Sequence, residues 1–331
     1  MNEVEVRERA ARLFPSGERR VRSTRVAVEH ELLAADVTSG APVPVERVRA
    51  VTRRAPYAAY LGFEPGGQVE LSLPTAGCPA DLSRHLRADL TALRRDCSAA
   101  GIRLIAQPVD ARSEAEVPLQ LVSPRYVAMQ RHFDTIGPAG RTMMRRTAST
   151  QVCLDWWPGR AGVEQWRLLQ LASPFLAAAF ARTFERTSRL ATWLEVDPTR
   201  TAFDGRLLHG DDPTVAYANF AMGATVFTAP TDVDLHLTTL FPPVRPRGRY
   251  LEVRFPDVQQ EDAVAPLVAA LASLTYDDLV RSAALRRVAG ERDRLDQHWY
   301  DAAHGTGDVA EFGRELVALT GVRVGSLDGA A

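Results

Sequence analysis

Four short segments of the chain alternate apolar and polar residues, which is the pattern of a strand with one buried face. Side chains two positions apart lie on the same side of a strand, so each segment has an apolar and a polar face. We expect the apolar faces to pack on helices. The four segments are RVAVEHELL (25–33), QVELSL (68–73), STQVCLDW (149–156) and RYLEVRF (249–255).

Other stretches have helical periodicity. Residues 81–100 carry leucines at intervals of three and four, as an amphipathic helix does. The apolar stretch 168–180 is too short to span a bilayer and is broken by polar residues, so it predicts a buried helix. The remaining expectations are a short helix and turn in 1–20, a strand-turn-strand at 61–73, a strand at 101–109, helices at 124–133, 161–186 and from 256 to about 320, loop at 34–56 and no firm assignment for 187–230.

The order of these elements decides the fold class. Helices and strands do not alternate regularly, which argues against a parallel sheet built from βαβ units. Strands with one apolar and one polar face are typical of antiparallel sheets. The sequence therefore predicts an α+β fold around an antiparallel sheet.

Composition removes several classes of function. The 331 residues have a net charge of −1, which gives no support for nucleic-acid binding. All 40 basic residues are arginine, so a P-loop lysine or a pyridoxal Schiff-base lysine is impossible. The three cysteines form no CxxC pair, and the N-terminus has no apolar signal core. We expect a cytoplasmic protein without a membrane span.

Acidic residues gather on the polar strand faces. Glu29 and Glu31 share one face, and Glu252 shares another with Arg254. Glu64 begins the Glu64-Pro65-Gly66-Gly67 segment, which predicts a type II turn, and Glu70 follows it. A solvated strand face explains any one of these strands, but neighbouring carboxylates repel one another unless a cation is present. Magnesium bridging carboxylates to nucleotide phosphates meets that need.

Five collinear segments resemble the glutamate–cysteine ligases of the plant and ergothioneine-pathway type. The resemblance runs from about residue 25 to 255, and we treat residues 1–331 as one catalytic domain with a helical C-terminal part, 256–331. The segments are VAVEHE (26–31), FEPGGQVELS (63–72), MMRRTASTQVCLDW (143–156), DPTRT (197–201) and HLTTLFPPVRPRGRYLEVR (236–254).

The resemblance implies a fold and a reaction. The fold is glutamine synthetase-like: a curved antiparallel sheet with a polar concave active-site face and helices on the other face. ATP, with Mg²⁺ or Mn²⁺, phosphorylates the glutamate γ-carboxylate, and the cysteine amine attacks the acyl phosphate. The partners are small molecules, with no nucleic acid and no membrane.

The resemblance also implies residue roles. Arg254 would neutralise the transferring phosphoryl group and Glu252 would act beside it, as the catalytic pair. Gln151, Arg254 and the weaker candidate Arg200 would contact the nucleotide. Arg146 and Cys153 would contact the amino-acid substrate. The metal-binding carboxylates would be Glu29, Glu31, Glu64, Glu70 and Glu252.

Two alternatives stay open. Cys153 stands where family members often have asparagine, and the segment before DPTRT is short, which favours a related ligase with another amine or acid. A catalytically silent binding protein of the same fold is the second alternative. Retention of all five glutamates and Arg254 argues against it, because a silent site has no reason to keep repelling carboxylates together.

Overall fold

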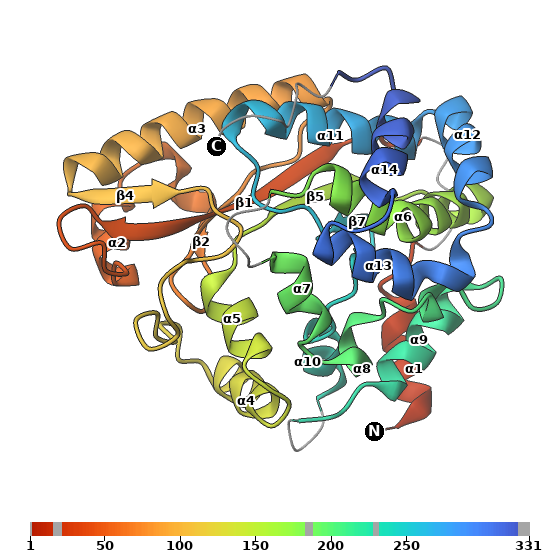
Figure 1. The fold of residues 1–331 in the computed structure, drawn as a ribbon, viewed down its shortest axis with the longest axis horizontal. Coiled ribbons are helices and arrows are strands. Elements are labelled where there is room, and N and C mark those ends of the chain that lie inside the picture. Colours follow the sequence, from red (N-terminus) through yellow and green to blue (C-terminus); the bar gives the residue numbers. More distant parts are fainter. Residues whose placement is uncertain (1, 16–21, 183–187, 228–231, 324–331) are drawn as a thin grey trace.

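A seven-stranded antiparallel sheet forms the centre of the protein. The computed structural model describes residues 2–15, 22–182, 188–227 and 232–323. The strands run in the order β2-β3-β1-β5-β7-β6, and β4 pairs with the far end of β1 (Figure 1). Their bounds are β1 Val26–Asp36, β2 Leu61–Phe63, β3 Val69–Ser72, β4 Ile102–Ile105, β5 Thr150–Asp155, β6 Val244–Pro246 and β7 Tyr250–Val253.

Strand register brings the polar residues onto one face. Residues directly opposite each other in an antiparallel pair point to the same side of the sheet. Glu31 lies opposite Glu70 in β3, and Glu29 lies opposite Gln151 in β5. Glu252 is paired with both Cys153 and Arg245. Alternation within each strand therefore becomes one continuous polar surface.

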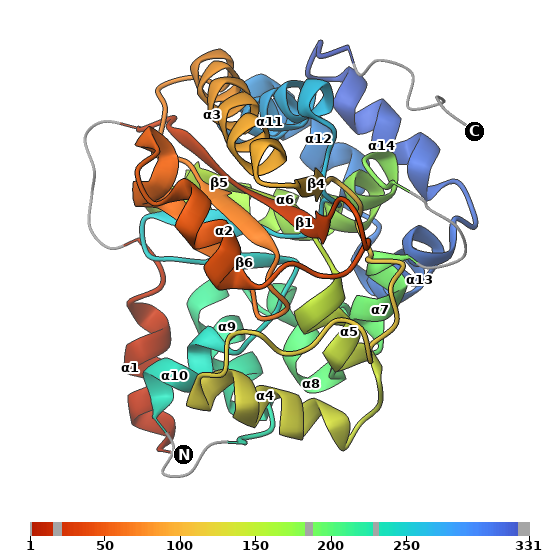
Figure 2. The same ribbon diagram turned by 90° about the vertical axis from the view of Figure 1, so that its left-hand side faces the viewer.

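The apolar face carries the core. Val28, Leu32, Leu71, Val152 and Val253 are fully buried. Figures 1 and 2 show helices lying along this face of the sheet. They are α3 Pro79–Ala99, α6 Gly159–Ala179 and α11 Glu261–Tyr276.

Helices also stand opposite the polar face, which the sequence did not predict. Figures 1 and 2 show α4, α5 and α7 on the side of the sheet away from α3 and α11. The α+β prediction is confirmed, but helices flank both faces. The bounds of these and the remaining helices are α1 Glu3–Ala11, α2 Val45–Thr52, α4 Pro124–Asp134, α5 Ala139–Arg146, α7 Arg189–Leu194, α8 Pro198–Thr201, α9 Pro213–Gly223, α10 Val233–Thr238, α12 Asp278–Val288, α13 Leu295–His304 and α14 Val309–Ala318.

Several local expectations need correction. The segment 34–56, expected as loop, contains the end of β1 and helix α2. The predicted helix 161–186 ends at Ala179, and its residues 183–186 lie outside the described part of the chain. The turn after β2 is not type II, because the positive φ (90°) falls on Gly67 rather than on Gly66.

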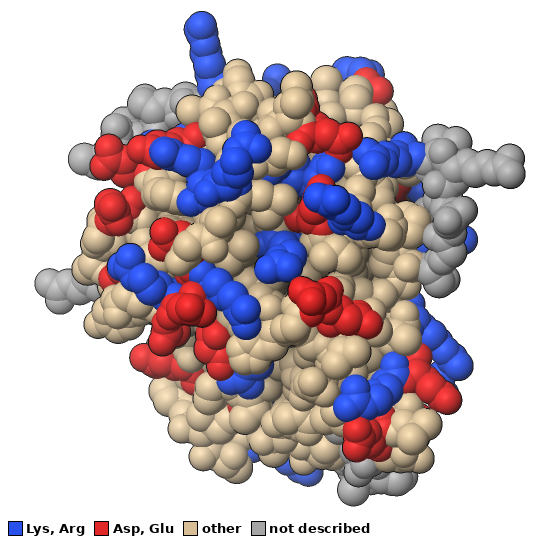
Figure 3. Space-filling model, turned by 90° about the vertical axis from the view of Figure 1, so that its right-hand side faces the viewer, with Lys and Arg blue, Asp and Glu red and all other residues tan. Residues whose placement is uncertain are grey.

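Helix composition and surface charge both bear on what the protein contacts. Within the described residues, no single helix is long and apolar enough to cross a membrane, although the bent pair α11–α12 passes by length and composition together. Figure 3 shows basic and acidic side chains interspersed over the face that it draws. This mixture agrees with the balanced overall charge.

The turn that carries Glu64 requires glycine at position 66. A Cβ built on Gly66 would lie 2.0 Å from the backbone oxygen of Arg145, whereas one on Gly77 would meet nothing within 4 Å. We expect Gly66→Ala to lower the free energy of unfolding by about 1–3 kcal/mol, because backbone must move to admit the methyl group. Urea denaturation tests this, with Gly77→Ala as the matched control. Equal stability of the two variants would contradict the close approach.

Candidate active site

A cavity of about 240 Å³ lies over the polar face of the sheet. Strands β1, β5, β6 and β7 contribute charged and polar side chains to it, and α4, α5 and α7 contribute much of the opposite wall. Glu29, Glu64 and Glu252, which come from distant parts of the chain, all line this one cavity. The convergence expected from the sequence is therefore present.

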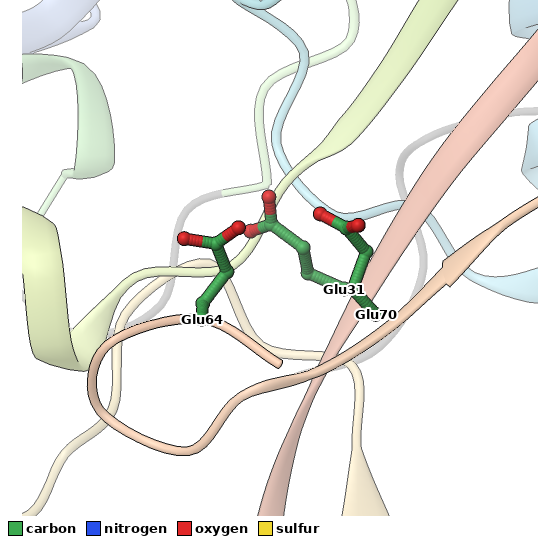
Figure 4. A group of neighbouring side chains, drawn as sticks. All are labelled: Glu31, Glu64 and Glu70. Carbon is green, nitrogen blue, oxygen red and sulfur yellow. The ribbon is translucent and has the colours of Figure 1, made fainter. Parts of the chain in front are cut away.

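Three carboxylates form a compact group, and two of them, Glu31 and Glu64, line the cavity. Glu31, Glu64 and Glu70 each offer an oxygen, and the three oxygens lie within 4.8 Å of one another. Figure 4 shows the three side chains gathered, Glu31 coming from β1, Glu70 from β3 and Glu64 from the turn between β2 and β3. This is the arrangement of oxygen ligands that a hard divalent cation prefers.

Glu31 is held in place by hydrogen bonds. Its carboxylate accepts from the backbone N of Ser149 at 2.8 Å, from Ser149 Oγ at 2.9 Å and from Gln151 Nε2 at 2.9 Å. Among the described residues, the Oε1 atom of Gln151 is buried without a hydrogen-bond partner. An orphaned oxygen on the side chain that contacts the Glu31 carboxylate fits a cation, so the donor set suits the metal that the resemblance implies.

The pKa values of the carboxylates indicate the same need for a cation. Burial, followed by the negative charges of Glu252 and Glu70, raises the pKa of Glu29 to about 8. Burial and the neighbouring carboxylates also raise the pKa values of Glu31 and Glu64. Carboxylates in this position either take up protons or share a cation.

Glu252 differs from the other four carboxylates because arginines surround it. Arg245 pairs with it at 2.7 Å, and Arg247 and Arg254 each approach to 3.6 Å. Burial acts to raise the pKa of Glu252, but the arginines outweigh burial and the net shift is downward. For Glu252 to bind a cation, the Arg245 guanidinium would have to leave its carboxylate.

Arg254 has unused hydrogen-bonding capacity. Within the described part of the chain, its Nε and Nη1 atoms are buried without a hydrogen-bond partner, and its guanidinium lies 5.7 Å from the ring centre of Phe241. Burial, followed by the charge of Arg245, lowers the pKa of Arg254 to about 10. Arginine with free donors suits a phosphate oxygen.

Three expected site residues lie elsewhere. Arg200 is fully buried and donates to the backbone O and Oγ1 of Thr239, and it does not line the cavity. Arg146 also lies outside the lining, where its Nη2 donates to the backbone O of Asp110. Cys153 lines a neighbouring cavity of about 190 Å³, which shares Glu29 with the first.

The cavity also contains residues that the sequence did not single out. Arg189 donates to the backbone oxygens of Phe255 and Arg254, and Arg125 and Tyr126 enter from α4. Nothing local marks Arg189 or Arg125 among 40 arginines. The helical spacing of Tyr126, Met129 and Phe133 was the one available signal for the α4 wall, because residues three and four apart share a helix face.

Partly buried carboxylates next to arginines suit cations and a phosphorylated ligand, which ligases that activate a carboxylate use. Comparison with known proteins agrees. The model of glutamate-cysteine ligase family 2 matches residues 25–306, so the chain belongs to this family of ligases. The predicted resemblance is thereby confirmed.

The relatives are longer than this chain. The glutamate–cysteine ligase EgtA of Mycolicibacterium smegmatis is 32% identical, covering 75% of this chain and 69% of the relative. The chloroplastic glutamate–cysteine ligase of Medicago truncatula is 25% identical, covering 81% of this chain and 58% of the relative. Among solved structures, a bifunctional glutathione synthetase from Pasteurella multocida covers 97% of this chain and 50% of its own, at 14% identity and a TM-score of 0.47.

The raised pKa of Glu29 predicts how pH acts on stability without metal. The folded protein keeps the Glu29 carboxyl protonated up to about pH 8, whereas the ordinary pKa of this group is 4.5. The stability that the protonated Glu29 carboxyl contributes to the fold is fully present below pH 4.5 and is lost as the pH rises through 8. We therefore expect Glu29→Gln to be more stable than the unmodified protein at pH 8.5 by at least about 1 kcal/mol, and to gain less at pH 5.

Urea denaturation in a chelator at the two pH values measures this difference. Glu46→Gln is the matched control, because the Glu46 side chain is 79% exposed and lies away from the cavity. A stability difference that is the same at pH 5 and pH 8.5 would refute the assigned titration of Glu29.

Proposed function

We propose that this protein is an ATP- and magnesium-dependent ligase that joins the γ-carboxylate of glutamate to the amine of cysteine. The observation that carries the proposal is the group of Glu31, Glu64 and Glu70, of which Glu31 and Glu64 line one cavity together with Arg254. Family membership supports the same chemistry. Residues 1–331 are proposed to act as one catalytic domain on small-molecule substrates.

The proposed metal ligands are Glu29, Glu31, Glu64 and Glu70, with Gln151 Oε1 beside them. Divalent cations bound there would bridge the carboxylates to the phosphates of ATP and neutralise charge during phosphoryl transfer. The protein's own contribution is position and electrostatics: the sheet holds the carboxylates at fixed spacing, and no covalent bond to the enzyme is needed.

The arginines are proposed to hold the anions. Arg254 directs its free donors at the transferring phosphoryl group, and Glu252 positions Arg254 and Arg245 by its ion pairs. Arg125 and Arg189, which also line the cavity, are the candidates for a substrate carboxylate. We leave Arg200 and Arg146 out of this set because their guanidinium groups make internal contacts outside the cavity.

A second candidate is a ligase of the same mechanism with a different amine. Cys153 favours it, because it stands where the family often has asparagine and lines a cavity that shares Glu29 with the first. A silent binding protein is disfavoured, because four of the five carboxylates form no ion pair with another described residue comparable to that of Glu252 with Arg245.

The direct test is product mass. With ATP, Mg²⁺, glutamate and cysteine, we expect release of ADP and a product equal in mass to the two amino acids joined with loss of water. Omission of Mg²⁺ or of glutamate should abolish both signals. ATP cleavage without any joined product, across a panel of amines, would refute the ligase assignment.

Loss of one carboxylate should weaken metal-dependent turnover. We expect Glu64→Gln to lower kcat at least 100-fold and to raise the Mg²⁺ concentration needed for half-maximal rate, because an amide oxygen binds a hard cation less tightly. Glu46→Gln should leave both quantities unchanged. Equal turnover in the two variants would contradict the metal assignment.

A further inference from the structure

The DPTRT segment (197–201) contains a buried ion pair that the proposed function does not use. Asp197 and Arg200 lie 3.3 Å apart, and their side chains are 3% and 0% exposed. Neither residue lines the cavity. Desolvating a buried ion pair offsets much of its attraction, so stability alone does not account for this one.

His132 joins this ion pair to helix α4. Its Nε2 atom donates to Asp197 Oδ2 at 2.7 Å, and the His132 side chain is 11% exposed. Burial acts to raise the pKa of Asp197, but the hydrogen bonds from His132 and Thr199 and the charge of Arg200 outweigh burial, and the net shift is downward. Asp197 is therefore a charged acceptor, and such hydrogen bonds are the strong ones.

Arg200 joins the same ion pair to the end of α10. Its Nη1 atom donates to the backbone O of Thr239 at 3.1 Å and to Thr239 Oγ1 at 2.8 Å. The backbone O of Arg200 accepts from the backbone N of Phe241 at 2.8 Å. The chain that leaves α10, residues 239–241, is thereby fixed to α8.

Arg125 connects the two anchored elements. It lies on α4 about two turns before His132, and its Nη2 atom donates to the backbone O of Thr238, the residue before Thr239, at 3.2 Å. Among the described residues its Nε atom is buried without a hydrogen-bond partner, and Arg125 lines the cavity. Figures 1 and 2 show α4, α8 and α10 together on the side of the sheet away from α3. The DPTRT segment thus fixes both the helix that carries Arg125 and the carbonyl that Arg125 contacts.

Resting on the proposed function, in which Arg125 is a candidate for a substrate carboxylate, we propose that His132 and the DPTRT segment position Arg125 to bind the carboxylate of an amino-acid substrate. The unpartnered Nε of Arg125 then finds its acceptor in that carboxylate. In the same function the phosphoryl group meets Arg254, which leaves Arg125 for the amino acid. His132, Asp197 and Arg200 act through Arg125 and are positioning residues.

Steady-state kinetics of His132→Leu and His132→Gln test the proposal. Leucine fills much of the imidazole space without a donor, whereas glutamine keeps an N–H donor. With ATP, Mg²⁺, glutamate and cysteine, we expect His132→Leu to raise KM for at least one of the two amino acids about tenfold or more. We expect kcat and KM for ATP to change less than about threefold, because the lost interaction serves amino-acid binding. His132→Gln should restore most of the loss.

The matched control is His298→Leu. His298 Nε2 pairs with Glu291 Oε2 at 2.7 Å, its side chain is 6% exposed, and it lies outside the cavity lining. This variant should lower the free energy of unfolding in urea about as much as His132→Leu does, and it should leave every KM unchanged. A general loss of stability is thereby separated from a loss of position.

A double variant tests whether His132 acts through Arg125. If it does, His132→Leu should raise the amino-acid KM by less than about twofold in an Arg125→Gln protein, because the two residues then act as one unit. Calorimetry with glutamate and with cysteine measures binding without turnover, in the presence of Mg²⁺ and a non-hydrolysable ATP analogue.

The outcomes separate the two proposals. If the amino acids are joined but His132→Leu raises only KM for ATP or no KM at all, or if its effect adds fully to that of Arg125→Gln, the positioning inference is wrong and the ligase stands. If nothing is joined but glutamate or cysteine binds, and His132→Leu weakens that binding while His132→Gln restores it, the positioning inference stands and the ligase assignment fails. Absence of both joining and binding would overturn the two together.

Discussion

Repulsion among buried carboxylates is the constraint around which this protein is organised. Glu31 and Glu70 lie directly opposite each other on paired strands, where like charges destabilise a sheet. Glu64 adds a third charge from a turn. A folded chain tolerates such a group only if protons or cations neutralise it, and the raised pKa values show how strongly the group demands one or the other. The rest of the proposed site meets this constraint: cations would neutralise the carboxylates, and arginines would bind the phosphates.

The sheet turns a local pattern into this site. Alternation fixes which side chains share a face within a strand, and register then aligns faces between strands. Cys153, Glu252 and Arg245 form a row across β5, β7 and β6 for this reason. The apolar face of the same strands packs on α3, α6 and α11, so the burial that stabilises the fold also keeps the carboxylates from separating.

Much of this was predictable from sequence and some was not. The strands, the antiparallel class and the shared face of Glu29 and Glu31 follow from period-two alternation. Helix α2 was missed because the prolines before it read as loop, although a proline suits a helix start. The Glu252–Arg245 pair and the arrival of Arg189 depend on tertiary contacts, which no local pattern encodes.

Arg254 and Arg200 illustrate why motif position alone does not assign a role. Arg200 is fully buried and Arg254 is mostly buried, and burial lowers the pKa of each to about 10. Arg200 donates to the backbone O and Oγ1 of Thr239 and lies 3.3 Å from Asp197, so its charge is satisfied internally. Among the described residues, Arg200 leaves Nε without a hydrogen-bond partner, whereas Arg254 leaves both Nε and Nη1 without one and lines the cavity. Because a buried donor without a partner costs free energy, the chain retains it most economically where a ligand oxygen completes it, and the same reasoning applies to the orphaned oxygen of Gln151 and a cation.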